Sequence, residues 1–139
     1  MKIDQDLYDE LVAHALEDAP NECCGLVAAK DGVATRVYRA GNLHASPLRY
    51  EIEAAEMFRL LDEIEQAGWD LGAIYHSHTR SAPYPSQTDI GIAVRGNPPQ
   101  AQWPGTLYVI VGVASPQEPD VRAYRIDGDG VEEVALSVA

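Results

Sequence analysis

Apolar residues recur along this chain with two periods, one typical of helices and one typical of strands. After Asp4, which is placed to cap a helix, apolar positions return every three or four residues until Pro20 ends the pattern. The same spacing predicts a second helix over 53–67, with Gly68 as its C-terminal stop. We expect this second helix to bury one face, which consists of Ala54, Met57, Phe58, Leu61 and Ile64.

Continuous apolar runs predict strands between and after these helices. Residues 24–29 and 33–38 flank a turn at 30–32 and predict a hairpin. The most strand-like segment, 106–114, is expected to be a buried, central strand. The remaining predicted elements are a strand at 69–75, a helix after Ser86, loops at 41–47, 80–85 and 96–104, and two strands at 121–126 and 131–136 around a turn at 127–130.

Length and charge limit the kind of protein this is. A chain of 139 residues with 46% apolar content predicts one domain over residues 1–139. The net charge of -12 argues against nucleic acid and anionic membrane as partners, because both bind through clustered lysine and arginine. Neither a membrane span nor a secretory signal is evident, and the only two cysteines are adjacent, so we expect a reduced, cytoplasmic protein.

The candidate chemistry lies where the predicted strand at 69–75 ends. His76 and His78 follow it one residue apart, so both imidazoles project from the same face of an extended chain. Asp89 adds a carboxylate from the helix that Ser86 is placed to cap. Two imidazoles and one carboxylate, with a fourth position open, are typical of catalytic rather than structural zinc. The pattern predicts one Zn²⁺ per chain in a metal-dependent hydrolase.

Hydrolysis at such a site also needs a group that moves protons. Glu22, at the start of the first predicted strand, is our candidate for the general base. Composition alone favours a solvated acid at this position, because the chain has 22 acidic residues. Ser86 has two compatible roles: its hydroxyl caps the helix, or it donates a hydrogen bond to the oxyanion of a tetrahedral intermediate.

Four other residues with ligand chemistry are interpreted as structural. His14 is expected to be a surface or edge histidine of the first helix, because nothing near it in sequence completes a site. His44 stands in a polar loop and is not expected to be a ligand. Cys23 and Cys24 are interpreted as small buried apolar residues, since the predicted metal site needs no thiolate.

These residues together resemble the JAMM (MPN-plus) zinc metalloproteases. That family has an upstream Glu, then His-x-His, seven residues, and Ser-x-x-Asp, and this chain has Glu22-Cys23-Cys24-Gly25-Leu26, Tyr75-His76-Ser77-His78 and Pro85-Ser86-Gln87-Thr88-Asp89. The resemblance covers nearly the whole chain. It implies an α/β, cytidine-deaminase-like fold with a curved mixed sheet and flanking helices. It also implies His76, His78 and Asp89 as zinc ligands, Glu22 as general acid/base and Ser86 as oxyanion support.

One position departs from the family pattern. Thr79 follows the second histidine, where the family usually has Pro. Thr79 and the segment 84–89 are most similar to the short bacterial members that remove cysteine from a ubiquitin-like sulfur-carrier protein with a C-terminal Gly-Gly. The resemblance implies such a carrier as partner. If cysteine is the leaving group, its free carboxylate would be stabilised by a nearby cation, and Arg49, Arg80 and Arg95 are candidates because they lie near the motif or its flanking loops. An exposed sheet edge would bind the Gly-Gly tail by strand addition.

The sequence leaves several functions open. A broader isopeptidase, which trims ubiquitin-like modifiers from lysines or processes their precursors, differs from the cysteine-releasing enzyme only in substrate. A catalytically silent interaction module is disfavoured by the intact set of Glu22, His76, His78, Ser86 and Asp89. A zinc buffer would not depend on Glu22. The sequence also leaves open whether the chain forms a homodimer.

Overall fold

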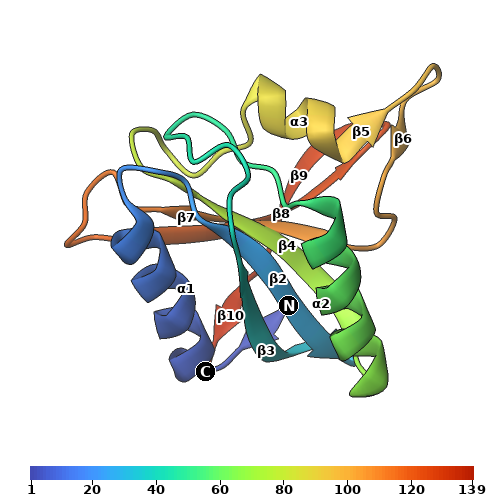
Figure 1. Cartoon of the computed structure of the whole chain (residues 1–139), viewed down its shortest axis with the longest axis horizontal. Coiled ribbons are helices and arrows are strands. Elements are labelled where there is room, and N and C mark those ends of the chain that lie inside the picture. Colours follow the sequence, from blue (N-terminus) through green and yellow to red (C-terminus); the bar gives the residue numbers. More distant parts are fainter.

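A curved, mixed β-sheet of eight strands organises the molecule, and the computed structural model describes residues 1–139 (Figure 1). The strands lie in the order β10-β1-β3-β2-β4-β7-β8-β9. Their bounds are β1 Lys2–Ile3, β2 Cys24–Lys30, β3 Val33–Ala40, β4 Asp70–His78, β7 Leu107–Gly112, β8 Asp120–Asp127, β9 Gly130–Val134 and β10 Ser137–Val138. The helices are α1 Gln5–Asp18, α2 Ala54–Gln66 and α3 Gln87–Ala93. This architecture confirms the expected α/β fold.

The central strands carry the candidate site. β4 pairs antiparallel with β2 and parallel with β7, so it is hydrogen-bonded on both sides. This pairing extends β4 to His78, beyond the predicted end of the strand, and places both histidines inside it. β7 lies next to β4 in the middle of the sheet, which confirms its predicted central position. A substrate tail therefore cannot join β4 as a new strand, because neither edge of β4 is free.

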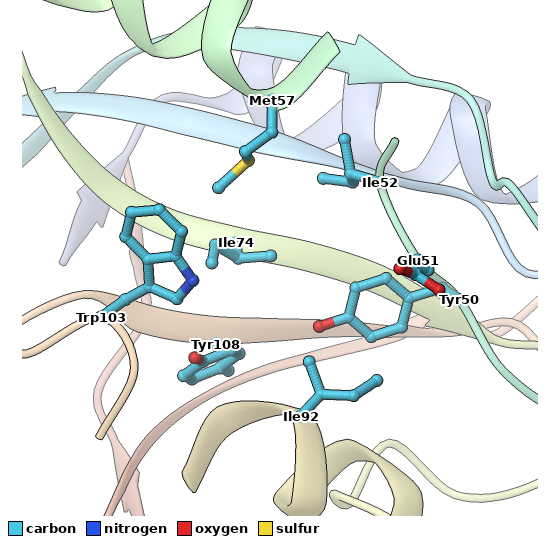
Figure 2. Close-up of a pocket in the computed structure, with 8 residues that line it drawn as sticks. All are labelled: Tyr50, Glu51, Ile52, Met57, Ile74, Ile92, Trp103 and Tyr108. Carbon is cyan, nitrogen blue, oxygen red and sulfur yellow. The ribbon is translucent and has the colours of Figure 1, made fainter. Parts of the chain in front are cut away.

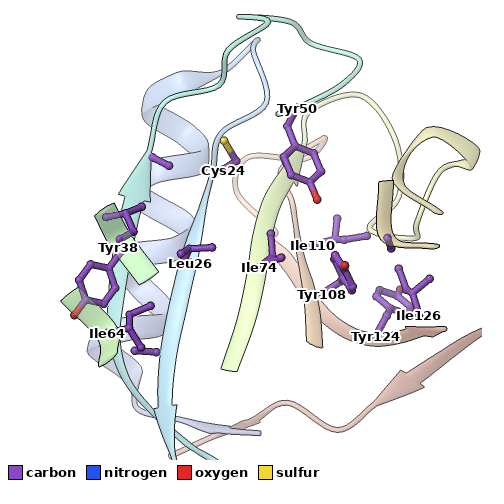
Figure 3. Close-up of a cluster of buried hydrophobic side chains, with 14 residues drawn as sticks. Cys24, Leu26, Tyr38, Tyr50, Ile64, Ile74, Tyr108, Ile110, Tyr124 and Ile126 are labelled. Atoms are coloured by element: carbon purple, nitrogen blue, oxygen red, sulfur yellow. The ribbon is translucent and has the colours of Figure 1, made fainter. Parts of the chain in front are cut away.

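Successive residues on each strand point to opposite faces of the sheet and build two separate cores. One core contains Leu26 and Ile74 under α2 (Figure 3), and the other contains Val27 and Tyr75 under α1. Side chains alternate faces along a strand, so His76 and His78 share the face of Ile74. The candidate site is therefore on the α2 and α3 side of the sheet.

The predicted helices are confirmed, but two of their residues lie elsewhere than expected. Asp4 caps α1 by accepting a hydrogen bond from the Leu7 amide at 2.8 Å. The buried positions of α2 are Leu60 and Ile64, whereas Phe58 is 76% exposed and Ala54 is exposed as well. The buried stripe thus runs through positions 57, 60, 61 and 64, and Phe58 falls about 100° away from Met57 around the helix.

His14 is buried, so the expectation of a surface histidine is wrong. Its Nδ1 lies 2.7 Å from the Tyr75 hydroxyl, and its Nε2 lies 3.3 Å from the Asp18 carboxylate. These two polar partners offset the loss of hydration when the imidazole is buried. The signal was present in the spacing, because residue 14 follows Leu11 by three positions and shares its helix face.

Short pairings account for the rest of the difference between expectation and structure. The predicted loop at 96–104 contains a short strand, β6 (Gln100–Ala101), which pairs with β5 (Val94–Arg95) in a small hairpin. β1 and β10, two residues each, pair in parallel and join the two ends of the chain. None of the helices is long and apolar enough to cross a membrane.

Candidate metal centre and active site

Three side chains converge on one buried point above the end of β4. His76 Nε2 lies 3.2 Å from His78 Nε2, and the Asp89 Oδ2 atom lies 3.1 Å from the former and 3.0 Å from the latter. All three residues are at most 4% exposed. The histidines come from β4 and the carboxylate comes from the first turn of α3, as the sequence spacing predicted.

Each imidazole is held in place by a group outside this cluster. His78 Nδ1 donates a hydrogen bond to the Ala82 carbonyl at 2.8 Å, which fixes the ring with Nε2 facing the cluster. The His76 ring stacks on Tyr50, with ring centroids 4.2 Å apart and planes 17° from parallel. His76 Nδ1 is buried without a hydrogen-bond partner. Tyr50 is therefore a part of the site that motif reasoning missed.

Asp89 is fixed by the start of its own helix. Ser86 Oγ accepts a hydrogen bond from the Asp89 amide at 3.0 Å, and Asp89 Oδ2 accepts one from the Ser86 amide at 2.9 Å, which is a capping box. This pair confirms the predicted cap. Burial raises the pKa of Asp89, but hydrogen bonds with His76 and His78 outweigh it and lower that pKa well below its usual range. The carboxylate is thus ionised.

The same interactions act differently on the two histidines. Burial lowers the pKa of His76 despite the nearby carboxylate of Asp89. At His78, burial also disfavours the charged ring, but Asp89 and the Ala82 carbonyl outweigh it and raise the pKa.

The donor set fits a divalent zinc ion. In a tetrahedral site with bonds of about 2.0–2.1 Å, the ligand atoms are separated by about 3.3 Å. The three atoms here, Nε2, Nε2 and Oδ2, are separated by 3.0 to 3.2 Å. Two imidazoles and one ionised carboxylate have the chemistry of catalytic zinc ligands. His76, His78 and Asp89 could therefore hold a metal ion together.

Glu22 is a buried carboxyl beside this cluster. It lies in the segment before β2 and is 5% exposed, and its Oε1 atom has no hydrogen-bond partner. Burial raises the pKa of Glu22 to about 7, with His78 opposing and Asp89 adding to the shift. Such a carboxyl exchanges its proton near neutral pH, as a general base or acid must.

The 42–51 loop holds the backbone of Glu22 in place. The Glu22 amide donates to the Ser46 carbonyl at 2.8 Å. Asn42 Nδ2 donates to the Glu22 carbonyl at 3.1 Å and to the Arg49 carbonyl at 2.9 Å. Its Oδ1 accepts from the amides of His44 and Glu51, each at 3.1 Å. One side chain, Asn42, therefore closes the loop and ties it to Glu22, and no motif in the sequence marked it.

The end of β4 is tied to the same segment from the other side. Ser77, fully buried between the two histidines, accepts a hydrogen bond from the Cys23 amide at 2.8 Å. Thr79 donates to the Pro20 carbonyl at 2.8 Å. Proline, the usual family residue at this position, has no hydroxyl to make this bond. These contacts link the strand that carries the histidines to the segment that carries Glu22.

The remaining candidates lie outside the cluster. Cys23 and Cys24 are free and fully buried, and burial raises the pKa of each thiol to about 12, so their expected structural role is confirmed. His44 Nε2 lies 2.8 Å from the Glu51 carboxylate, and His44 is not one of the clustered ligand residues. All three arginines are exposed, and two of them, Arg49 and Arg95, line one cleft beside the centre.

Comparison with known proteins identifies the family. The model of prokaryotic homologues of the JAB domain matches residues 4–127. The chain belongs to this family. Its fold is similar to that of a JAMM structure described as a metalloprotease-like zinc site in the proteasome and signalosome. The TM-score is 0.59 at 20% identity, covering 100% of this chain and 97% of that one. A solution structure from Desulfitobacterium hafniense matches with a TM-score of 0.86 and 29% identity over 99% of this chain and 92% of that one.

Three curated relatives are similar over almost the whole of this JAB-domain chain. The CysO-cysteine peptidase of Mycobacterium tuberculosis is 33% identical, covering 96% of this chain and 87% of the relative. A desampylase of Haloferax volcanii is 34% identical, with 96% and 92% covered. A protein of Thermus thermophilus, named probable TtuB-protein conjugate cleaving protease, is 37% identical, with 95% and 78% covered. These peptidase relatives indicate a hydrolase.

Proposed function

We propose that this protein is a zinc-dependent peptidase that cleaves the amide bond after the C-terminal Gly-Gly of a ubiquitin-like sulfur-carrier protein and releases cysteine. The convergence of His76, His78 and Asp89 beside the buried carboxyl of Glu22 carries the proposal. The substrate is supported by a relative whose name refers to CysO-cysteine. The free thiols of Cys23 and Cys24 support a reducing compartment such as the cytoplasm.

In this proposal His76, His78 and Asp89 hold one zinc ion. When bound, zinc supplies a Lewis acid that polarises the scissile carbonyl and makes water more acidic. The chain itself supplies the orientation of the ligands: the Ala82 carbonyl fixes His78, the Tyr50 ring supports His76, and the capping box fixes Asp89. These contacts keep the ligand atoms in position before the metal arrives.

Glu22 moves the proton. As a carboxylate, its partnerless Oε1 accepts a proton from the attacking water, and as a carboxylic acid it returns that proton to the nitrogen of the leaving amine. A pKa of about 7 lets Glu22 carry out both steps near neutral pH. The bonds from its backbone to Ser46 and Asn42 hold the carboxyl near the cluster while it does so.

Ser86 stabilises the oxyanion. Its oxygen accepts from the Asp89 amide, which leaves the hydroxyl hydrogen free to donate, and the side chain is exposed to a substrate. We assign this hydrogen to the developing negative charge on the scissile carbonyl oxygen. The cap and the oxyanion contact use different parts of the hydroxyl and are therefore compatible.

A broader isopeptidase is the second candidate, because one relative is named for cleaving TtuB-protein conjugates. The two functions share a site and differ in the leaving amine. Intact-mass analysis separates them: one carrier protein is prepared with a C-terminal cysteine and, separately, linked through Gly-Gly to a lysine of a second protein. We expect loss of cysteine at a much higher kcat/KM than loss of the lysine-linked protein. The reverse order would establish the isopeptidase.

A further inference from the structure

A cleft of about 210 Å³ lies between the 42–51 loop and α3. It adjoins the candidate metal centre, because Tyr50 in its wall stacks on His76, and Thr88, also in its wall, directly precedes Asp89. Tyr50 also borders an apolar cavity of about 140 Å³ on its other side, toward which its hydroxyl points (Figure 2). A substrate bound at the centre therefore has the cleft within reach.

The cleft is positively charged in a strongly acidic protein. Arg49 and Arg95 both line it, and neither forms an ion pair. The only carboxylate in its wall, Glu51, already accepts a hydrogen bond from His44 at 2.8 Å. With a net charge of -12, the chain has an excess of carboxylates that these two guanidinium groups do not engage.

The other arginines contrast with this pair. Those outside the site are occupied: Arg39, Arg59, Arg122 and Arg125 form ion pairs with glutamate or aspartate, and Arg36 lies over the Tyr38 ring. Arg80 has no ion pair but lines neither the cleft nor the apolar cavity. Unpaired arginine is therefore concentrated beside the metal centre.

The wall that carries Arg49 is built to keep its shape. The Arg49 carbonyl accepts from Asn42 Nδ2 at 2.9 Å, and the Leu43 amide donates to the Glu51 carbonyl at 2.8 Å. These bonds fix the backbone on both sides of Tyr50. A guanidinium on a fixed backbone loses less freedom when it binds a planar anion.

We propose that Arg49 and Arg95 together bind a carboxylate of the substrate in this cleft. This inference rests on the proposed function and adds to it a feature that the substrate must have. Two sources supply the same chemistry: the free α-carboxylate of the leaving amino acid, and an acidic side chain of the carrier tail upstream of Gly-Gly. Because β4 has no free edge, a tail that approaches the centre must lie against other elements, and the loop and α3 are beside it.

Acetylated hexapeptides that end in Gly-Gly-Cys test this inference. One series has a free or an amidated C-terminus, and a second places Glu or Gln in turn at each position upstream of Gly-Gly. Each peptide is assayed with wild type, Arg49→Gln, Arg95→Gln and, as a matched control, Arg125→Gln, which removes an equal charge from a residue that does not line the cleft. We expect Arg49→Gln and Arg95→Gln each to raise KM about tenfold with kcat unchanged, and only for peptides that carry the recognised carboxylate.

The pattern of losses identifies the source. If amidation of the C-terminus abolishes the difference between wild type and variants, the leaving amino acid supplies the carboxylate. If replacement of Glu by Gln abolishes this difference, the tail upstream of Gly-Gly supplies the carboxylate. Equal KM values for all four proteins, or equal losses for peptides without either carboxylate, would overturn the inference.

A binding measurement separates the test of the cleft from the test of the proposed function. The dissociation constants of the same peptides, labelled at the N-terminus, are measured by fluorescence anisotropy. If wild type cleaves none of them, the proposed function fails. The cleft is still supported if Arg49→Gln and Arg95→Gln weaken binding of the acidic peptides alone, and it is refuted if they bind all peptides as wild type does.

Discussion

Asn42 offers a sharp test of how the active site is assembled. Its amide makes four hydrogen bonds, two donated by Nδ2 to the carbonyls of Glu22 and Arg49 and two accepted by Oδ1 from the amides of His44 and Glu51. Asn42→Ala removes all four. Asn42→Asp has the same shape and retains the two accepted bonds, but it replaces both donors with an oxygen that faces two carbonyl oxygens.

The expected magnitudes follow from these bonds. At about 0.5–1.5 kcal/mol for each hydrogen bond, and at the lower end for a half-exposed loop, Asn42→Ala destabilises the closed loop by about 2–4 kcal/mol. Asn42→Asp loses two of the four bonds and adds repulsion between its second oxygen and the two carbonyl oxygens, so its cost is at least half as large. Both variants release the Glu22 carbonyl, and a displacement of the carboxyl by about 1 Å lowers kcat by up to about a hundredfold.

The assay combines three readouts on the same preparations. Zinc content should equal that of wild type in both variants, because Asn42 bonds to none of the three proposed ligands. Hydrogen exchange at the amides of His44 and Glu51 should accelerate in Asn42→Ala and much less in Asn42→Asp. Turnover should fall in both. Wild-type kcat in Asn42→Asp, together with protected loop amides in Asn42→Ala, would refute the positioning role of Asn42.

Three further predictions concern stability and pH. A Cβ at Gly25 would lie 2.3 Å from the Tyr38 carbonyl oxygen and 2.5 Å from the Tyr75 ring. Gly25→Ala should therefore lower the free energy of unfolding, measured by urea titration, by about 3 kcal/mol. An unchanged urea midpoint would contradict this packing. Burial lowers the pKa of His14, so below about pH 6.5 the unfolded chain binds a proton that the folded chain does not, and the free energy of unfolding falls. His14→Gln should make this fall with pH less steep. An equally steep fall in the variant would argue against a role for His14. Burial raises the pKa of Glu22 to about 7, so kcat/KM should increase as pH rises through that value. A kcat/KM that is constant between pH 6 and 8 would exclude Glu22 as the base.

Much of the fold was predictable because its signals are local. The caps at Asp4 and Ser86, the apolar period of α2 and the run of β7 each depend on residues close together in sequence. The two-residue strands β1 and β10 were not predictable, because they exist only through pairing between the two ends of the chain. Phe58 was misplaced because hydrophobicity alone does not define which side of a helix meets the sheet.

The cluster of candidate metal ligands was predictable for the same reason, and its surroundings were not. His76 and His78 share a strand, and Asp89 follows a cap that the sequence shows. Tyr50 and Asn42 act through contacts with residues 26 and 20 positions away, and no short motif encodes such contacts. Buried polar groups placed by long-range pairing are the features that this sequence conceals.

Turnover per bound zinc in Glu22→Gln tests the central claim most directly. Glutamine has the shape of glutamate but cannot take up the proton of the attacking water. We expect a zinc content equal to that of wild type and a rate of cysteine release from a Gly-Gly-Cys carrier that is lower by about a hundredfold to ten-thousandfold. A Glu22→Gln protein that keeps its zinc and hydrolyses the carrier at the wild-type rate would contradict the account.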